Sequence, residues 1–301
     1  MKFSVIILSF NRREELRETL ETVLETTYRP LEVIVVDNAS SDDSVAMVLR
    51  EFPSVRILPL EQNIGIAGYN IGVEHSSGDV VVLLDDDSAI ETDALESVCA
   101  RLENSPDVGC VAFRISLRGG QVVTCTWGEE VPSFWGCGAA IRRSVWDATG
   151  GYDEDFFLYL NEIDLAIRIW AQGFRVVYAP ECHAVHRVAK SNRASGRLVR
   201  YSARNAVWFH LKHVPWLWLP RTLAADLLSY FWLALLGGCL GDWAKGVTEG
   251  FEMRHLALRK RRAVDAGVLS FYRKNAFMWQ SPLRQLWVRR GSRLNTRPSD
   301  V

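Results

Sequence analysis

Short apolar runs alternate with amphipathic stretches over the first hundred residues of the chain. The runs are rich in Val and Ile and span five to seven residues, which predicts strands that are buried on both faces. We expect strands at residues 3–9, 31–37, 55–59 and 79–84, and helices at residues 13–25, 41–51, 66–75 and 91–103. This alternation predicts an α/β fold, in which a mostly parallel sheet is flanked by helices on both faces.

The pattern is less regular after residue 103. Candidate strands lie at residues 108–113, 121–126 and 135–141, and a short helix is expected at residues 164–172, where Gly173 ends it. Beyond Arg187 basic residues alternate with aromatic ones, and seven of the eleven Trp residues lie there. We therefore expect two parts, an α/β domain over residues 1–190 and a helical, aromatic-rich, basic extension over residues 191–301.

Charge separates the same two parts. From Lys190 onward the chain carries 20 Lys and Arg against 6 Asp and Glu, and the preceding residues hold the remaining 15 and 30. The longest uncharged apolar run, residues 227–241, has 15 residues, fewer than the roughly 20 that a membrane-spanning helix needs. Trp beside Arg and Lys fits a helix that lies on an anionic membrane surface. An aromatic-rich helical domain that packs on the sheet fits this composition equally well.

The apolar fraction of 48% and the charged fraction of 24% are those of a folded globular protein. The six cysteines show no CxxC pair and no ligand-like spacing with His, so buried thiols are expected rather than disulfides or a zinc site. Apolar residues 5–8 are too short for the core of a signal peptide, and polar residues 11–15 follow at once. These features predict a cytoplasmic location.

An acidic triplet, Asp85 to Asp87, follows the apolar residues 80–84. Residues two apart on an extended chain project the same way, so Asp85 and Asp87 can converge while Asp86 points elsewhere. Two such carboxylates repel each other unless a cation lies between them, and this end of a strand is where open α/β sheets bind ligands. The triplet therefore predicts a site for Mg²⁺ or Mn²⁺ shared with a diphosphate, with a solvated acidic turn as the alternative.

Three further polar stretches follow predicted strands or open predicted helices. Asp37 ends a strand, where a carboxylate can accept hydrogen bonds from a ribose or a base, and it precedes Asp42 and Ser41, which can cap the next helix. The turn with Asn63 and Gly65 can bring backbone N–H groups to an anion at a helix N-terminus. The acidic residues of 150–157 and 161–165 predict a general base, or acids that complement a helix dipole.

Several stretches together carry a resemblance. They are SVIILSFNR, VIVVDNASSDDS, NIGIAGYNIG, GDVVVLLDDDS, GGYDEDFFLYLNEIDLAIRIWAQGFRVVY and the His of AVHRV, in that order over residues 3–187. On these motifs the chain resembles a family 2 glycosyltransferase of the Rossmann-like GT-A fold, particularly the rhamnosyltransferase-like bacterial branch. Residues 200–214, with Tyr201, Arg204, Asn205 and His213, also resemble the tail of these enzymes.

The resemblance implies a role for each matching residue. Asp85 and Asp87 match the DxD pair that holds the metal ion and, through it, the diphosphate, and His186 matches a histidine that completes the metal site in several relatives. The metal ligands implied are thus Asp85, Asp87 and His186. The donor-binding residues implied are Phe10, Asn11, Arg12, Asp37, Asn63, Gly65, Asp85 and Asp86.

The position of the catalytic base departs from the family pattern. The family has an acidic pair followed by x-Asp-Leu, and this chain reads Asn161, Glu162, Ile163, Asp164. Glu162 takes the position of the base, and the loss of a carboxylate at Asn161 should lower the pKa of Glu162. Asp164 is expected to orient the site or to pair with a basic residue.

The resemblance implies a metal-dependent, inverting hexosyl or rhamnosyl transferase. It would move a sugar from a nucleotide donor, UDP- or dTDP-linked, to a hydroxyl of a glycan or lipid-linked acceptor in cell-envelope polysaccharide synthesis, at the inner face of the membrane. No nucleic acid partner is expected. A catalytically silent nucleotide-sugar binder is the alternative that Asn161 favours. A sugar nucleotidyltransferase or a dehydrogenase fits less well, because residues 9–13 lack the glycines that either would place there.

Overall fold

The computed structural model describes residues 1–122, 128–187 and 195–275, and its chain divides into two compact units, Met1–Ser191 and Asn192–Val301. The strands of the first unit are β1 (Phe3–Ser9), β2 (Leu31–Asp37), β3 (Arg56–Pro59), β4 (Val80–Asp85), β5 (Ser88–Ile90), β6 (Val108–Leu117), β7 (Ala139–Arg142) and β8 (Arg175–His186). Its helices are α1 (Arg13–Leu24), α2 (Ser44–Glu51), α3 (Gly68–Glu74), α4 (Ala94–Glu103), α5 (Arg143–Thr149) and α6 (Asn161–Ala171), with short 3₁₀ helices at Gly65–Ala67 and Glu154–Phe156.

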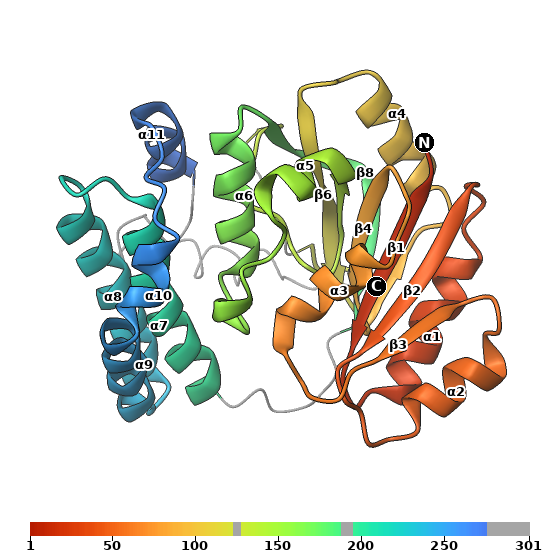
Figure 1. The fold of residues 1–301 in the computed structure, drawn as a ribbon, viewed down its shortest axis with the longest axis horizontal. Coiled ribbons are helices and arrows are strands. Elements are labelled where there is room, and N and C mark those ends of the chain that lie inside the picture. The colour runs from red at the N-terminus through yellow and green to blue at the C-terminus, as the bar shows by residue number, and fades with distance from the viewer. Residues whose placement is uncertain (123–127, 188–194, 276–301) are drawn as a thin grey trace, which may run out of the picture. The chain divides into compact units, whose positions relative to one another are not determined.

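The strands form one mixed sheet in the order β3-β2-β1-β4-β7-β6-β8-β5 (Figure 1). The part that contains β1 to β4 is parallel, and the α/β fold predicted from the sequence is confirmed. In the register of this part, Ser9 pairs with Asp37, and Leu8 pairs with Asp85. The carboxyl ends of three neighbouring strands therefore meet at one edge, and each carries a polar residue of the predicted site.

Helices cover both faces of the sheet because its central strands are apolar on both. On β1, Val5 and Ile7 face a core cluster that also holds residues of α1, α2 and α4. Ile6 faces a second cluster, built with residues of α3, α5 and α6. All five residues from Val80 to Leu84 on β4 are fully buried, as expected for a strand in the centre of a sheet.

The second half of the unit departs from the predicted boundaries. The strand expected at residues 121–126 is an isolated bridge from Val122 to Ser116, and residues 123–127 lie outside the described residues. The strand expected at 135–141 begins only at Ala139. Helix α6 begins at Asn161, three residues earlier than expected, which places Glu162 and Asp164 in its first turn.

The second unit is helical, as predicted. Its helices are α7 (Ser195–His213), α8 (Leu219–Leu236), α9 (Leu240–Glu252), α10 (Arg254–Arg259) and α11 (Ala266–Asn275). Helix α7 packs on α8, α9 and α10, and glycines let α9 approach it closely. The Trp208 indole donates to the carbonyl of Gly250 at 3.0 Å, and a Cβ on Gly246 would lie only 2.1 Å from the carbonyl oxygen of Arg200. Within the described residues, no helix is both long and apolar enough to cross a membrane.

Candidate active site

The end of β2 provides a buried carboxylate with one open acceptor. Asp37 is 1% exposed, and its Oδ2 accepts a hydrogen bond from the backbone N–H of Ser40 at 2.9 Å. Its Oδ1 is buried and has no hydrogen-bond partner among the described residues. A buried acceptor is rarely left unpaired in a folded protein, so this oxygen is suited to a hydroxyl or N–H of a ligand.

The turn after β1 lies beside this carboxylate. Asn11 adopts a left-handed φ of 53°, its backbone N–H donates to Ser40 Oγ at 2.9 Å, and its Oδ1 accepts from the N–H of Ser41 at 2.7 Å. The backbone N–H of Phe10 donates to Asp86 Oδ2 at 3.1 Å, while its ring remains 43% exposed. The structure thus joins the turn after β1 to the one after β2, leaving an open aromatic ring beside them.

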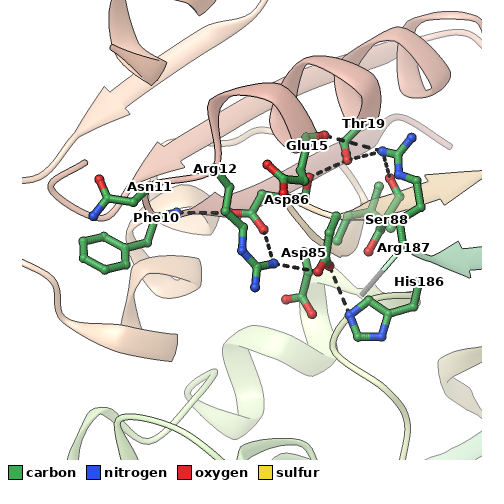
Figure 2. Close-up of polar contacts among 12 residues, drawn as sticks. Phe10, Asn11, Arg12, Glu15, Thr19, Asp85, Asp86, Ser88, His186 and Arg187 are labelled. Atoms are coloured by element: carbon green, nitrogen blue, oxygen red, sulfur yellow. Dashed lines mark hydrogen bonds and ion pairs between the residues drawn. The ribbon is translucent and has the colours of Figure 1, made fainter. Parts of the chain in front are cut away.

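The acidic triplet is divided between two sets of contacts (Figure 2). Asp85, the last residue of β4, accepts a hydrogen bond from the Tyr69 hydroxyl at 3.1 Å. Arg12 Nη1 lies 3.0 Å from Asp86 Oδ1 and 2.6 Å from Asp87 Oδ2. The same guanidinium therefore bridges Asp86 and Asp87. The expectation that Asp86 points away from Asp87 is wrong, because both carboxyl groups contact Arg12.

Burial and charge act on these two carboxyl groups in opposite net directions. Burial raises the pKa of Asp86 to about 7; the positive charge of Arg12 opposes this rise, and the negative charges of Asp87 and Asp85 add to it. Asp87 is also penalised by burial, but its hydrogen bonds and ion pairs with His186 and Arg12 bring its pKa down to about 2. The Asp87 carboxylate is therefore the firmly ionised member of this pair.

Among the described residues, one group of ligand atoms lies close enough to hold a metal ion; the atoms belong to Asp85, Cys137 and His186 and lie within 4.8 Å of one another. The sequence predicted Asp85 and His186 in this set, with Asp87 as the third ligand. Asp87 is not in this group; it lies 3.1 Å from His186 Nε2 and pairs with Arg12, and its role as a ligand stays a prediction. The alternation argument fails here because β4 ends at Asp85, so Asp87 belongs to a turn and not to the strand.

These donors fit a divalent ion. Carboxylate oxygen and imidazole nitrogen both bind Mn²⁺, and carboxylate oxygen is the usual protein ligand of Mg²⁺. Cys137 adds a softer donor that the spacing of cysteines and histidines did not reveal. Burial, and the nearby charges of Asp85, Asp87 and Glu162, raise the pKa of the Cys137 thiol well above its usual range. With no ion bound, Cys137 is therefore a neutral thiol.

Glu162 lies near the same group of acids. It lies in the first turn of α6, after a segment in which Phe157, Tyr159 and Leu160 all have positive φ values of 60° to 68°. Non-glycine residues rarely adopt this conformation, and such strain often gathers at functional sites. On the other side, a Cβ on Gly136 would lie 2.8 Å from Glu162 Oε1, so the absence of a side chain there makes room for the carboxyl group.

The pKa of Glu162 is raised to about 7, chiefly by burial and also by the negative charge of Asp85. Hydrogen bonds from backbone N–H groups, including that of Gly136, offset part of the rise. This rise is relative to the ordinary pKa of a glutamate, so the expectation that Asn161 lowers the pKa relative to a chain with an acid at that position stays a prediction.

Asp164 holds α6 in position, and Asn161 is buried beside it in the first turn. Asp164 is fully buried and forms an ion pair with Arg168 at 2.7 Å, as expected for an aspartate that pairs with a basic residue. Arg168 in turn donates to the carbonyl of Thr149 at the end of α5, at 2.6 Å. Asn161 is buried, and its Oδ1 has no hydrogen-bond partner in the part of the chain that the structure describes.

The glycine-containing turn braces the site. The side chain of Asn38 accepts from the N–H of Ile64 and donates to the carbonyl of Gly65, both at 3.0 Å. Asn63 Oδ1 accepts from the N–H of Gly65 at 2.9 Å, and the N–H of Ile66 donates to the carbonyl of Phe157 at 2.8 Å. Three successive N–H groups are thus already bonded within the protein. The turn connects the end of β2 to the segment before Glu162, and it does not offer these groups to an anion.

Gly65→Ala should destabilise the protein. Gly65 has a φ of +63°, and a Cβ there would lie 2.3 Å from the carbonyl oxygen of Phe157. Strain of this kind costs about 1–3 kcal/mol of unfolding free energy. Chemical denaturation measures the loss. Gly128→Ala is the matched control, because an added Cβ there meets no described atom within 4 Å; equal stability of the two variants would contradict the assignment.

Arg187 supports the acidic triplet from behind and was not predicted. Its guanidinium donates to Thr19 Oγ1 at 2.7 Å and to the carbonyl of Ser88 at 3.3 Å, and its backbone N–H donates to the carbonyl of Asp87 at 2.7 Å (Figure 2). The Thr19 hydroxyl donates to the carbonyl of Asp86 at 2.7 Å. These bonds fix the backbone of the turn through residues distant in the sequence, which a local pattern does not reveal.

Comparison with known proteins shows the family of this chain. The family model described as glycosyl transferase family 2 matches residues 4–150. Glucosyl-dolichyl phosphate glucuronosyltransferase of Haloferax volcanii is 31% identical over 226 residues, which cover 62% of this chain and 70% of the relative. The N-acetylglucosaminyl-diphospho-decaprenol L-rhamnosyltransferase of Mycobacterium tuberculosis is 23% identical over 237 residues, or 62% of this chain and 76% of the relative.

Solved structures share the fold. GalNAc-T7 with UDP, GalNAc and Mn²⁺ superposes with a TM-score of 0.65 at 17% identity, over 83% of this chain and 56% of that one. The mannosyltransferase PcManGT from Pyrobaculum calidifontis, in complex with GDP-Man and Mn²⁺, gives 0.57 at 22% identity, over 95% of this chain and 87% of that one. The chain belongs to glycosyltransferase family 2 and has the GT-A fold.

Proposed function

We propose that the chain is a metal-dependent, inverting glycosyltransferase with Glu162 as its general base. The observation that supports this most directly is the buried carboxyl group of Glu162 in the first turn of α6, whose pKa is raised to about 7 by burial and by the negative charge of Asp85. A base whose pKa lies near the working pH is the most effective, because it is both ionised and a good proton acceptor. Asp85 belongs to the group of metal-donor atoms as well, so base and metal site are neighbours.

The donor nucleotide would be held by the residues at the ends of β1 and β2. The unpaired Oδ1 of Asp37 is available to ribose hydroxyls or the base edge, and the exposed Phe10 ring can cover the base. Asp85 and His186, with Cys137 or Asp87 beside them, would hold the ion. Such an ion withdraws negative charge from a departing nucleoside diphosphate. Arg12 keeps Asp86 and Asp87 in place and limits their mutual repulsion.

The chemical step would depend on Glu162. Its carboxylate accepts the proton of an acceptor hydroxyl while that oxygen forms a bond to the anomeric carbon. The bond from this carbon to the diphosphate oxygen breaks on the opposite face, so the configuration inverts and the proton stays on Glu162. Asp164 does not take part directly; with Arg168 it positions the helix that carries Glu162.

The acceptor is proposed to be a lipid-linked saccharide or a growing glycan. Two relatives, by name, act on glucosyl-dolichyl phosphate and on N-acetylglucosaminyl-diphospho-decaprenol, and both are prenyl-linked sugars. A chain that uses such an acceptor would work in the cytoplasm at the inner face of the cell membrane, with UDP- or dTDP-sugars as donors.

Release of nucleoside diphosphate tests the proposal. The full chain is incubated with Mn²⁺ or Mg²⁺ and a panel of UDP-, dTDP- and GDP-sugars, and slow release of diphosphate from one donor is expected. A protein that binds a nucleotide sugar by calorimetry but releases nothing with either ion would instead be the silent binder that the buried Asn161 favours.

The rate should depend on pH through Glu162. The carboxylate must be ionised to accept a proton, and its pKa is raised to about 7, so turnover should fall as the pH drops below 7, by about tenfold per unit once the group is mostly protonated. An ordinary glutamate, which titrates near 4.5, would leave the rate flat down to pH 6. Steady-state rates at saturating Mn²⁺ from pH 5.5 to 9 decide between the two.

Asn161→Asp extends the same test. It restores an acid next to Glu162, which should raise the pKa of Glu162 further and shift the acidic limb of the profile to higher pH. A profile that stays flat in both proteins would show that Glu162 is not the base.

A further inference from the structure

Helix α8 has the reverse polarity of an ordinary surface helix. Four of its apolar residues are open to solvent: Leu228 is 48%, Trp232 47%, Leu235 44% and Leu236 76% exposed. The only acidic residue of the helix, Asp226, is 1% exposed and lies 3.7 Å from the imidazole of His210. A helix on a water-facing surface normally carries its charges outward and its apolar residues inward.

The exposed residues form one continuous stripe. At about 100° per residue, the positions fall within an arc of about 120°. We call this stripe the α8 face, and its members are Arg221, Ala224, Ala225, Leu228, Trp232, Leu235 and Leu236. Arg221 is the only charged member, so the α8 face carries no carboxylate. Contiguous exposed apolar surface of this kind usually marks an interaction site.

The opposite side of α8 is already occupied by its own unit. The Trp243 indole of α9 donates to the carbonyl of Leu227 at 3.0 Å, and its ring packs against Phe231 with centroids 5.3 Å apart. Leu223 and Ala234 are buried on this side. These contacts fix the rotation of α8 about its own axis, so the α8 face is the side that remains exposed.

Cations and indoles gather at the start of α8. Trp216 and Leu217, in the turn before the helix, are 60% and 85% exposed. The guanidinium of Arg261 lies 3.9 Å from the centroid of the Trp216 ring, and that of Arg273 lies 4.6 Å from the centroid of the Trp218 ring. Indole rings favour the boundary between headgroups and acyl chains, and guanidinium groups bind the phosphates above it.

We propose that the α8 face and the turn at Trp216 lie in the headgroup–acyl boundary of an anionic lipid bilayer, with the helix axis parallel to the membrane. The charges favour lipid over a second copy of the chain. A second copy docked through the same face would bring no carboxylate to Arg221, whereas phospholipid phosphates supply that counter-charge. The inference deepens the proposed function, on which its purpose depends: an enzyme held at the surface meets a lipid-linked acceptor by diffusion in two dimensions.

Vesicle sedimentation of the full chain tests the α8 face. The chain should sediment with vesicles of phosphatidylglycerol and phosphatidylcholine, and much less with phosphatidylcholine alone. Trp232→Glu and Leu236→Glu should each lower the partition coefficient about tenfold or more, because each puts a charge into the apolar boundary. Arg221→Glu should weaken binding to the anionic vesicles selectively. Leu49→Glu is the matched control, an exposed leucine of α2 whose change should have no effect.

Three readouts keep the result decisive. Circular dichroism shows whether each variant folds, and Leu236→Ser replaces any variant that does not. The proposal would be overturned if Leu236→Glu and Leu236→Ser partitioned onto vesicles as the wild type does. It would also be overturned if the wild type bound no vesicles and formed a dimer by light scattering that Leu236→Glu converts to monomers. Diphosphate release without vesicles should be unchanged in these variants. If vesicles bind and no donor is ever cleaved, the proposed function fails and the membrane surface stands.

Discussion

Glu162→Gln should remove turnover and leave nucleotide-sugar affinity nearly unchanged. The amide has the size of the carboxyl group and can still accept the hydrogen bond from the backbone of Gly136, so the surrounding fold should be kept. It cannot accept a proton, however, and general-base catalysis of this type contributes about 10²–10⁴-fold to the rate. The loss should therefore appear in kcat, with donor binding preserved because the proposed donor site lies at the ends of β1, β2 and β4.

The measurement pairs a rate with an affinity. Diphosphate release with acceptor gives kcat, and calorimetry with Mn²⁺ and the uncleaved donor, or the nucleoside diphosphate alone, gives Kd. Glu74→Gln, the same change on the exposed surface of α3, should leave both values as in the wild type. If Glu162→Gln lowered the affinity for the sugar donor as strongly as it slowed turnover, Glu162 would belong to the donor site. Another residue would then have to be the base.

The sequence predicted the parallel part of the sheet well, because its information there is local. β1, β2 and β4 are apolar runs whose residues pack on helices that follow directly in the chain. The rest of the sheet depends on distant pairings: β7 joins β4 to β6, and the three-residue strand β5 pairs with the end of β8. No periodicity marks such partners, so the strand expected at residues 135–141 was placed too early and β5 was missed.

The same distinction separates the predicted site residues from those missed. Asp37 and Asp85 end strands, and Glu162 opens a helix, so a pattern along the chain can find them. Cys137 joins the metal-donor group only because the loop before β7 returns to the end of β4. The pKa of Glu162 had the same origin. Burial by the folded chain and the charge of Asp85 raise it, and neither can be found from the residues next to Glu162 in the sequence.

Asp87→Ala should weaken the binding of Mn²⁺ and of the donor together with turnover. The side chain is fully buried between Arg12 and His186, and its removal leaves a cation and an imidazole at the proposed donor site without their carboxylate. Loss of a charged hydrogen-bond partner costs about 1–3 kcal/mol of free energy. The cost is smaller here because Arg12 still has its ion pair with Asp86. Asp85→Asn should weaken Mn²⁺ binding at least as strongly, since Asp85 itself belongs to the group of candidate metal ligands.

Titration with Mn²⁺, followed by electron paramagnetic resonance of the free ion, separates the two roles open to Asp87. Asp147→Asn is the control, because its ion pair with Arg143 lies on the surface and far less depends on it. If Asp87 binds the ion, Asp87→Ala and Asp85→Asn should lose Mn²⁺ affinity to a similar extent. If Asp87→Ala slows turnover while Mn²⁺ binds as in the wild type, Asp87 is a positioning residue that holds Arg12 and His186. In that case the metal ligands are Asp85, Cys137 and His186, and Cys137→Ser, rather than Asp87→Ala, should weaken Mn²⁺ binding.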